Sequence, residues 1–301
     1  MTDYSYIDKP EDLKLLINSI RESGAGILAM DFEEESNLHV YGEHLCIIQL
    51  FDGSNYYVID ALAVSATEEG KALIRDLLEG PETKIMFDCS SDAAIVRKSL
   101  GIQLKNIYDI RLVAKALGFQ GNLSALIERN LGVEAESTAE KKKYQKANWM
   151  KRPIPEAQLN YALNDVRYLF DLKRSLEEEM GRELSPSAVK QLSNNMKRCA
   201  NQKHKDKPGW EKICNYHMLE YREKVFIRHF FNARDTLARK ANVPPTNIME
   251  KQKIVQMAKA GTWEGILEGP SLRYTATFEK ARLEAEKDLQ KTDDNNRIRF
   301  M

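Results

Sequence analysis

Short apolar runs separated by polar turns dominate the first third of the chain. Four of these runs have the length and the β-branched content of buried strands: GILAMDFE, HLCIIQLF, YYVIDAL and KIMF. The turn sequence DGSN separates the second run from the third, and the first three runs are close enough in sequence to form an antiparallel meander. The predicted strands cover residues 26–33, 44–51, 56–62 and 84–87.

Stretches with helical periodicity precede and follow these strands. Several of them stop at a glycine, Gly101, Gly118 or Gly132, which suits the left-handed conformation at the end of a helix. Because strands come first and strand–helix alternation follows, the pattern predicts an α/β fold in which helices cover a mixed sheet. The predicted helices cover residues 10–23, 67–79, 91–100, 111–117, 123–131 and 155–179.

The rest of the chain shows a helical pattern with no strand signal. Helices are predicted over 211–241, 249–260 and 274–291, and the VPP sequence at 243–245 separates the first two. We therefore expect two domains with a boundary near residue 182. The expected organisation is a first domain over 1–182, a basic connecting region over 183–211, an all-α domain over 212–291 and a disordered tail over 292–301.

Composition indicates a globular protein, with 43% hydrophobic and 30% charged residues in a chain of 301. No apolar run is long enough to span a membrane, and the polar, acidic N-terminus shows no secretory signal. The four cysteines form no CxxC pair. We therefore expect reduced thiols in a cytoplasmic protein, and neither a zinc site nor a disulfide framework.

The formal net charge is zero, but the charge is unevenly distributed. Residues 1–180 carry 21 basic and 30 acidic side chains, a net charge of −9, whereas residues 181–301 carry 24 and 15, a net charge of +9. A basic half favours an anionic partner, although two solvated surfaces of unequal composition would give the same totals.

Carboxylates stand at three places in the predicted α/β half. Asp31 and Glu33 end an apolar strand, and their spacing of two puts both on one face. Tyr161 and Asp165 lie four residues apart, about one turn, on a predicted helix. Asp92 falls in the first turn of the helix after KIMF, a position that also suits an acid facing the helix dipole. Taken singly, none of these patterns is specific.

Their order, and the segments around them, resemble the DEDD superfamily of 3′–5′ exonucleases, specifically the ribonuclease D branch that has a tyrosine in its last motif. The resemblance covers about residues 25–180. It implies a ribonuclease H-like mixed sheet flanked by helices. The segments that carry it are DFEEE, HLCIIQLFDGSNYYVIDAL, KNIYDIRLVAKALG, NLSALIERNLGV and NWMKRPIPEAQLNYALNDVRYLFDL.

The resemblance assigns a role to each acid. Asp31 and Glu33 match the first motif, Asp92 the second, and Tyr161 with Asp165 the third. It implies that the four carboxylates hold two divalent ions, Mg²⁺ or Mn²⁺, which suit hard oxygen ligands. Tyr161 would orient or help to deprotonate the attacking water. The implied reaction releases 5′-mononucleotides from single-stranded RNA 3′ ends, as in tRNA or small-RNA processing, with no membrane and no nucleotide cofactor involved.

Two positions depart from the family pattern. Asp88 stands where a histidine is expected, and Asn148 stands where an aspartate is frequent. Asp88 either adds an acid to the metal site or is a solvated residue at the end of a strand. For Asp109, an N-cap of the following helix is the expected role.

Basic and aromatic residues precede the last motif and are candidates for substrate binding. The KKKYQK cluster at 141–146, together with Lys151 and Arg152, could guide the phosphates of a nucleic acid strand. Trp149 either stacks on a base or packs in the core.

The all-α half resembles an HRDC domain, the helical module of ribonuclease D and some helicases, in the segment from LEYREKVF to GTWEGI. Its basic residues would contact phosphates without reading sequence. Those of the first helix, Arg222, Lys224, Arg228, Arg234, Arg239 and Lys240, cannot all share one face.

Two alternatives to an exoribonuclease stay open. A DNA exonuclease could use the same fold and metals, since RNA is distinguished by contacts to the 2′-hydroxyl that the sequence does not locate. A non-catalytic RNA-binding scaffold is the other, and in such a protein we would expect one or more motif acids to be missing.

Overall fold

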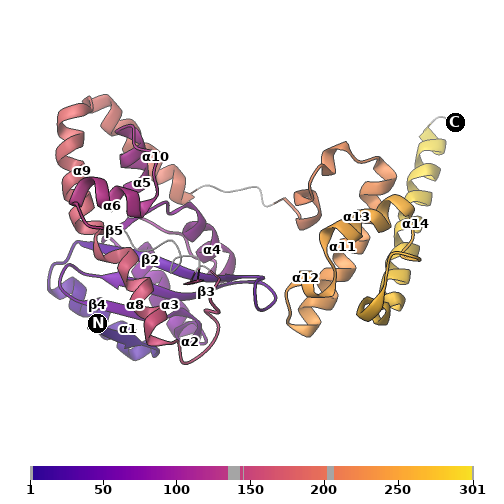
Figure 1. The fold of residues 1–301 in the computed structure, drawn as a ribbon, viewed down its shortest axis with the longest axis horizontal. Helices are drawn as coiled ribbons and strands as arrows, with labels where there is room; N and C mark the ends of the chain where they lie inside the picture. Colours follow the sequence, from indigo (N-terminus) through magenta and orange to yellow (C-terminus); the bar gives the residue numbers. More distant parts are fainter. Residues whose placement is uncertain (1–2, 135–142, 145, 202–206, 300–301) are drawn as a thin grey trace. The chain divides into compact units, whose positions relative to one another are not determined.

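The computed structural model describes residues 3–134, 143–144, 146–201 and 207–299. Their contacts divide the chain into two compact units, which are described one at a time. Unit 1 comprises Met1–Glu35 and Glu43–Gln202, and unit 2 comprises Ser36–Gly42 and Lys203–Met301. Unit 1 contains the sheet, and the helical segments after residue 207 make up most of unit 2 (Figure 1).

A six-stranded mixed sheet forms the centre of unit 1, in the order β1-β4-β3-β2-β5-β6. Strand β1 pairs with β4 in parallel, and β5 pairs in parallel with both β2 and β6, whereas β3 and β4 are antiparallel. The predicted α/β class with a mixed sheet is confirmed. The strands are β1 (Tyr4–Ile7), β2 (Ile27–Ser36), β3 (Glu43–Phe51), β4 (Tyr56–Asp60), β5 (Thr83–Met86) and β6 (Ile107–Asp109).

Helices cover both faces of this sheet because its strands send apolar side chains to both sides. Along β2, Leu28, Met30 and Phe32 pack into a core with α1, α3 and α4, while Ala29 packs with α5, α6 and α9 on the other face. The helices are α1 (Pro10–Glu22), α2 (Ala61–Val64), α3 (Glu68–Glu79), α4 (Ser90–Leu100), α5 (Ile110–Ala116), α6 (Leu123–Leu131), α8 (Glu156–Arg167), α9 (Leu169–Glu183) and α10 (Pro186–Asn201).

Several elements of unit 1 differ from the sequence prediction, which contained neither α2 nor β6. The single helix predicted over 155–179 is two helices, α8 and α9, which meet at Tyr168. Strand β1 was not predicted, because its four residues, YSYI, give too short a pattern and only Ile7 is buried. It lies at the edge of the sheet beside β4.

Helix α10 lies within the range 183–211, which the sequence analysis treats as a connecting region. Its side chains Leu192, Met196 and Ala200 are buried at intervals of four, and the helix contacts α4, α5 and β6. The contacts therefore divide after residue 202 and not at 182. The sequence analysis missed this helix because its exposed face is polar and basic, which made the segment resemble a connecting region.

Unit 2 is helical around its own core. Phe226, Phe230, Ile254, Met257 and Phe278 are fully buried in it. Its elements are η1 (Gly209–Lys212), η2 (Tyr216–Met218), α11 (Tyr221–Ala241), α12 (Pro245–Ile248), α13 (Lys251–Ala260), η3 (Gly269–Tyr274) and α14 (Thr275–Arg299).

The C-terminal segment corrects one expectation. Helix α14 continues to Arg299, so most of the tail predicted to be disordered over 292–301 is helical. Among the described residues, no helix has the length and the apolar character that crossing a membrane would require.

Candidate metal-binding active site

Three of the predicted acids converge on one face of the sheet. Asp31 and Glu33 come from β2, and Asp165 comes from α8. Their carboxylate oxygens lie within 4.8 Å of one another. All three side chains are partly buried, so the cluster is open to solvent while its surroundings restrict hydration. Residues separated by more than 130 positions therefore form one acidic cluster.

Local structure explains why these side chains point the same way. On β2, Met30 and Phe32 are buried on the opposite face, so the alternation of the strand places Asp31 and Glu33 together. On α8, buried Ala162 and Val166 anchor the helix, and α8 contacts β3 and β4. Tyr161 and Asp165, which directly precede these two residues in the sequence, are therefore partly buried.

Asp92 approaches the cluster without belonging to the tight group. It lies in the first turn of α4, which follows β5, the parallel neighbour of β2. Its charge raises the pKa values of both Asp31 and Glu33, so it is close enough to act on them electrostatically. The fourth predicted acid thus belongs to the same region of the fold.

Burial and mutual repulsion make ionisation of this cluster unfavourable. Burial first, then the charges of Asp165, Asp92 and Glu33, raise the pKa of Asp31 well above its ordinary value. The pKa of Glu33 is raised well above its ordinary value by burial and by Asp165 and Asp92. Burial and the charge of Glu34 raise the pKa of Asp92 to about 8.

This donor set fits divalent cations. Carboxylate oxygens are the ligands that Mg²⁺ and Mn²⁺ prefer, and ligand oxygens around one such ion lie about 3–4 Å apart given metal–oxygen bonds of about 2.1 Å. The spacing within 4.8 Å is compatible with one ion or with a pair sharing ligands. A bound cation would also remove the repulsion that raises the pKa values of Asp31 and Glu33.

Tyr161 lies one helical turn before Asp165 on α8 and is partly buried. Its ring stacks on that of Tyr144, with 4.8 Å between ring centroids and 27° between ring planes. This contact restrains the tyrosine ring beside the acidic cluster. The role expected for its hydroxyl from the sequence, orienting a water molecule, stays a prediction.

Asp88 and Asp109, the two other acids that the sequence analysis considered, each interact with a neighbouring residue. Asp88 forms an ion pair with Arg111 and adopts a left-handed backbone with φ of 62°, which aspartate tolerates. Asp109 caps α5 as predicted, since its carboxylate accepts a hydrogen bond from the backbone N–H of Leu112. Asp88 is not among the acids whose oxygens converge in the cluster of described residues.

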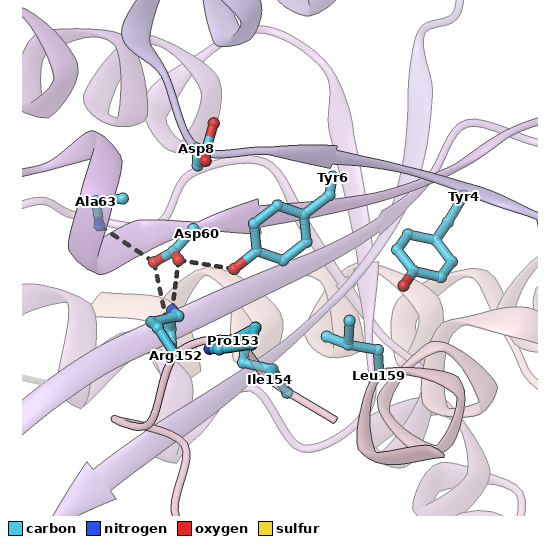
Figure 2. Close-up of a pocket in the computed structure, with 9 residues that line it drawn as sticks. All are labelled: Tyr4, Tyr6, Asp8, Asp60, Ala63, Arg152, Pro153, Ile154 and Leu159. Atoms are coloured by element: carbon cyan, nitrogen blue, oxygen red, sulfur yellow. Dashed lines mark hydrogen bonds and ion pairs between the residues drawn. The ribbon is translucent and has the colours of Figure 1, made fainter. Parts of the chain in front are cut away.

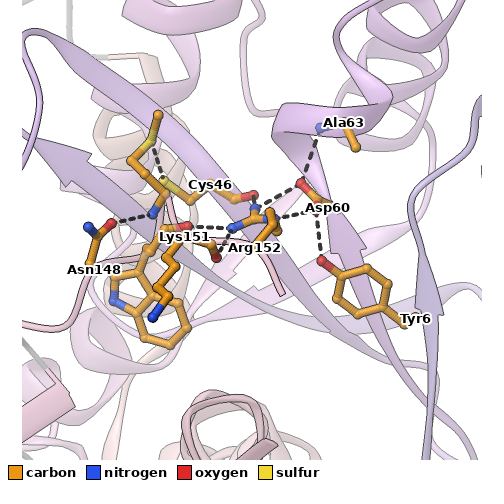
Figure 3. A network of polar contacts seen from close by, with 9 residues as sticks. Tyr6, Cys46, Asp60, Ala63, Asn148, Lys151 and Arg152 are labelled. Carbon is orange, nitrogen blue, oxygen red and sulfur yellow. Dashed lines mark hydrogen bonds and ion pairs between the residues drawn. The ribbon is translucent and has the colours of Figure 1, made fainter. Parts of the chain in front are cut away.

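Arg152 lies in a polar network that accounts for its hydrogen-bonding capacity (Figure 3). Its Nε donates to Asp60 Oδ2 at 2.5 Å and its Nη2 donates to Asp60 Oδ1 at 2.8 Å. Its Nη atoms also donate to the carbonyl oxygens of Trp149, Lys151 and Cys46. The guanidinium therefore fastens the segment before α8 to the end of β4.

Asp60 receives further donors in this network. Tyr6 Oη donates to Asp60 Oδ2 at 2.7 Å, and the backbone N–H of Ala63 donates to Oδ1. Burial opposes ionisation of Asp60, which is 3% exposed, but the hydrogen bonds from Arg152 and Tyr6 hold its pKa below the ordinary value. The result is a satisfied ion pair between a buried carboxylate and a partly buried guanidinium.

The same residues line a cavity of about 490 Å³, shown in Figure 2. Tyr4 and Tyr6 from β1 stand on one side, and Pro153 and Leu159 complete an apolar wall. The acids of the cluster, Asp31, Glu33 and Asp165, are not among its lining residues. The cavity is thus a feature apart from the acidic cluster.

The predicted substrate contacts need correction at Trp149. This side chain is 2% exposed and packs with Ile154 and Leu159, so it is not accessible for stacking on a base and fulfils the packing alternative. Arg152 is already committed to Asp60, whereas Lys151 is exposed and keeps its predicted role as a hypothesis. Lys141, Lys142 and Gln145 of the basic cluster lie outside the described residues.

Gln49 is a candidate that the sequence analysis did not single out. By strand alternation it shares a face with Phe51, which packs in the same core as Ala29, and Ala29 shares a face with Asp31 and Glu33. Gln49 is fully buried, and neither polar atom of its amide has a hydrogen-bond partner in the described part of the chain. A buried amide without a hydrogen-bond partner is costly and suits a contact with a ligand. The sequence does not reveal this role, because a single glutamine in an apolar strand forms no recognisable motif.

Comparison with known proteins gives the following matches. Residues 4–181 match a family model described as 3′-5′ exonuclease. Ribonuclease D of Desulfotalea psychrophila is 28% identical over 261 residues, which cover 86% of this chain and 67% of the relative. Ribonuclease D of Haemophilus influenzae is 31% identical over 176 residues, which cover 58% of this chain and 41% of the relative.

Solved structures share the fold over most of the chain. The catalytic core of RRP6 from Trypanosoma brucei superposes with a TM-score of 0.75 at 19% identity, covering 97% of this chain and 81% of that one. RNase D of Escherichia coli, described as an exoribonuclease involved in structured RNA processing, gives a TM-score of 0.71 at 22% identity, covering 93% and 76%. These similarities establish a common fold.

Proposed function

The chain belongs to the 3′-5′ exonuclease family, and we propose that it is a divalent-metal-dependent exoribonuclease that releases 5′-mononucleotides from the 3′ ends of RNA. The observation that carries this proposal is the convergence of Asp31, Glu33 and Asp165, with Asp92 acting on them electrostatically. The relatives named Ribonuclease D support RNA as the substrate. Within that class, we propose tRNA or other small RNAs as the substrates.

In this proposal Asp31, Glu33, Asp92 and Asp165 hold two ions, Mg²⁺ or Mn²⁺. Bound ions of this kind lower the pKa of water and stabilise charge on the oxygens of a phosphodiester under attack. The protein's own contribution is to fix the carboxylates, and Tyr161, restrained by Tyr144, orients the attacking water through its hydroxyl. A restrained ring costs little further ordering when the reaction occurs.

Unit 2 would serve as the RNA-binding module. The order of α11, the proline break, α12, α13 and α14 suits the HRDC-like assignment proposed for residues 212–291. Arg222, Arg239 and Lys240 of α11 are exposed and available to phosphates, whereas Arg234 is 2% exposed and stacks over Phe231. Only part of the basic helix would therefore contact RNA.

The test is degradation of RNA that carries a label at its 5′ end, with Mg²⁺ or Mn²⁺ present. We expect a ladder of products shortened one nucleotide at a time, and we expect Asp31→Ala and Asp165→Asn to abolish it. Asp12→Asn is the matched control, because Asp12 is exposed on α1, the helix that packs on the opposite face of the sheet. Equal activity of Asp165→Asn and Asp12→Asn would refute the proposed site.

The same assay discriminates between the two alternatives. A DNA exonuclease would shorten a matched DNA strand faster than the RNA. A non-catalytic scaffold would bind RNA but leave it intact with either metal, and the presence of all the motif acids in the sequence argues against it.

A further inference from the structure

A second cluster of potential metal ligands lies outside the carboxylate cluster. Cys89 precedes α4 as its N-cap, Asp109 ends β6, and Cys199 lies near the end of α10. Their Sγ and carboxylate oxygen atoms lie within 4.8 Å of one another. Cys89 and Asp109 are fully buried, and Cys199 is partly buried. Three elements of unit 1 thus bring together two thiols and one carboxylate.

We propose that Cys89, Asp109 and Cys199 form a binding site for a sulfur-preferring divalent cation of the Zn²⁺ type. The proposal concerns the stability and assembly of unit 1 and does not depend on the proposed nuclease activity. The lack of a CxxC pair conceals the site in the sequence, because its two cysteines are 110 residues apart.

The separation of the two sulfur atoms fits a shared ion better than a disulfide. Cys89 Sγ and Cys199 Sγ are 3.9 Å apart. Two thiolates bound to one tetrahedral zinc ion, with bonds of about 2.3 Å, lie about 3.8 Å apart. A disulfide would require the sulfurs to approach to about 2.0 Å. The observed separation needs almost no movement for metal binding.

Asp109 keeps one acceptor position available for such an ion. Its Oδ1 accepts hydrogen bonds from the backbone N–H groups of Asp88 and Leu112, and its Oδ2 accepts one from the N–H of Cys89. A carboxylate has about four lone-pair positions, so these three bonds leave one on Oδ2. The same bonds fix the orientation of the carboxylate, as hydrogen bonds to metal ligands commonly do.

One sulfur of the pair is favoured as a thiolate, whereas the hydrogen bond to Cys199 and burial raise the pKa of Cys89 well above its ordinary value. Cys89 Sγ–H donates to Cys199 Sγ, and this hydrogen bond lowers the pKa of Cys199 below its ordinary value. The charge of Lys115 lowers this pKa further, while burial and the nearby carboxylates oppose it. Thiolates are the form of cysteine that binds metals. Three protein ligands would leave the fourth position of a tetrahedral ion to water, and the partial exposure of Cys199 gives solvent access.

An ion at this position would link the last helix of unit 1 to its catalytic region. Cys199 belongs to α10, which contacts α4, α5 and β6. Cys89 lies three residues before Asp92, the acid in the first turn of α4. The ion would therefore tie α10 to the start of the helix that carries Asp92.

Cobalt substitution tests the site directly. The full chain, reduced and freed of metal by chelation, is titrated with Co²⁺, and absorption in the near-ultraviolet is recorded. Bonds between Co²⁺ and thiolates produce a charge-transfer band there, whereas the carboxylate cluster, which contains no sulfur, produces none. We expect a band that saturates at one Co²⁺ per chain and disappears when one equivalent of Zn²⁺ is added.

Three variants assign the band. Cys199→Ser should lose the band. Its affinity for Zn²⁺ should fall by more than the about 10–100-fold that is typical when only a hydrogen-bond partner of a metal ligand is changed. Asp109→Asn keeps the capacity to cap α5 and should weaken Zn²⁺ binding with the band shifted. Cys214→Ser, which removes an exposed cysteine of unit 2, is the control and should retain the band. Circular dichroism of each variant establishes that it is folded.

Three outcomes would overturn the proposal. One is a reduced wild-type chain that shows no thiolate band at saturating Co²⁺. Another is a band of equal strength in folded Cys199→Ser and Cys214→Ser. The third is isolation of the chain, without added oxidant, with Cys89 and Cys199 joined as a disulfide, which thiol counting and peptide mass analysis would detect.

Discussion

Asp31, Glu33 and Asp92 occupy positions where folding opposes their ionised forms. Burial is the largest cause for each, and neighbouring carboxylates add to it. Residues that stabilised the fold alone would not require such an arrangement, since apolar side chains of similar size would pack there without the electrostatic penalty. The penalty is consistent with a site that is completed by cations.

The raised pKa values predict how stability depends on pH. The folded chain retains protons that the unfolded chain releases, so the free energy of unfolding of the metal-free protein should fall as pH rises. For Asp92 this range lies between its ordinary value of 3.8 and about 8. Saturating Mn²⁺ should reverse the loss, so the rise in Tm on adding Mn²⁺ should be larger at the upper end of this range.

Thermal unfolding with and without Mn²⁺ at both ends of the range measures this difference. Asp31→Asn, which removes one charge from the cluster, should reduce the rise in Tm caused by Mn²⁺. A rise that is independent of pH, or larger in acid, would contradict the electrostatic explanation.

The phenol of Tyr161 is predicted to act in the reaction and to contribute little to binding. Tyr161→Phe should lower kcat by about 10²-fold or more, in the range of catalysis by a positioned proton-transfer group, and leave RNA affinity nearly unchanged. Single-turnover kinetics and RNA binding in Ca²⁺ would separate the two effects. Tyr144→Phe, which retains the stacked ring, is the control and should be close to wild type. Full activity of Tyr161→Phe would exclude the hydroxyl from the mechanism.

Sequence patterns identified the acids because each lies on a regular element. Alternation on β2 and the spacing of four on α8 place Asp31, Glu33 and Asp165 without knowledge of the tertiary structure. Sequence patterns could not reveal the unpartnered amide of Gln49 or the contact of Cys89 with Cys199, because both features depend on packing between elements that are distant in the sequence.

Strands and helices were predictable where local chemistry marks their ends. Thr67 and Asp109 cap α3 and α5 with their side chains, and Gly101 ends α4 in a left-handed conformation with φ of 65°. Strand β1 and helix α10 lacked such marks. Strand β1 acquires its structure by pairing with β4, and α10 acquires its structure by burying Leu192, Met196 and Ala200.

The segment before α8 depends on the ion pair of Arg152 with Asp60. Removing one partner of a largely buried pair leaves the other without its hydrogen bonds, so Arg152→Ala should lower the free energy of unfolding by about 2 kcal/mol or more. Chemical denaturation would measure this loss. Lys151→Ala is the adjacent control and should change stability by less than about 0.5 kcal/mol, because Lys151 is exposed. Equal stability of the two variants would contradict a structural role for Arg152.

The two halves of the chain carry opposite net charges, −9 over residues 1–180 and +9 over residues 181–301. Part of the basic excess is neutralised within unit 2, since Arg228 pairs with Asp288, and Arg282 pairs with Glu279 and Glu286. The exposed basic residues that remain are fewer than the composition suggests, which is why charge counting alone could not define an RNA-binding surface.

Binding of RNA to the whole chain should weaken as salt increases. Each phosphate contact that is lost should reduce the slope of log K against log salt by about 0.7 for a single strand. Arg222→Ala together with Lys240→Ala should therefore flatten the slope, while Glu211→Gln, at an exposed acid of unit 2, should not. Fluorescence anisotropy over a salt series measures these slopes, and an unchanged slope in the double variant would exclude α11 from the RNA contact.

The most direct test of the metal centre is calorimetric titration of the chain with Mn²⁺ near neutral pH, without RNA. Mn²⁺ prefers oxygen ligands, so the thiol site should contribute little. We predict Mn²⁺ binding by the wild type and Asp12→Asn, and its loss in Asp165→Asn, whose side chain belongs to the cluster within 4.8 Å. No binding by the wild type, or equal binding by Asp165→Asn, would contradict the account.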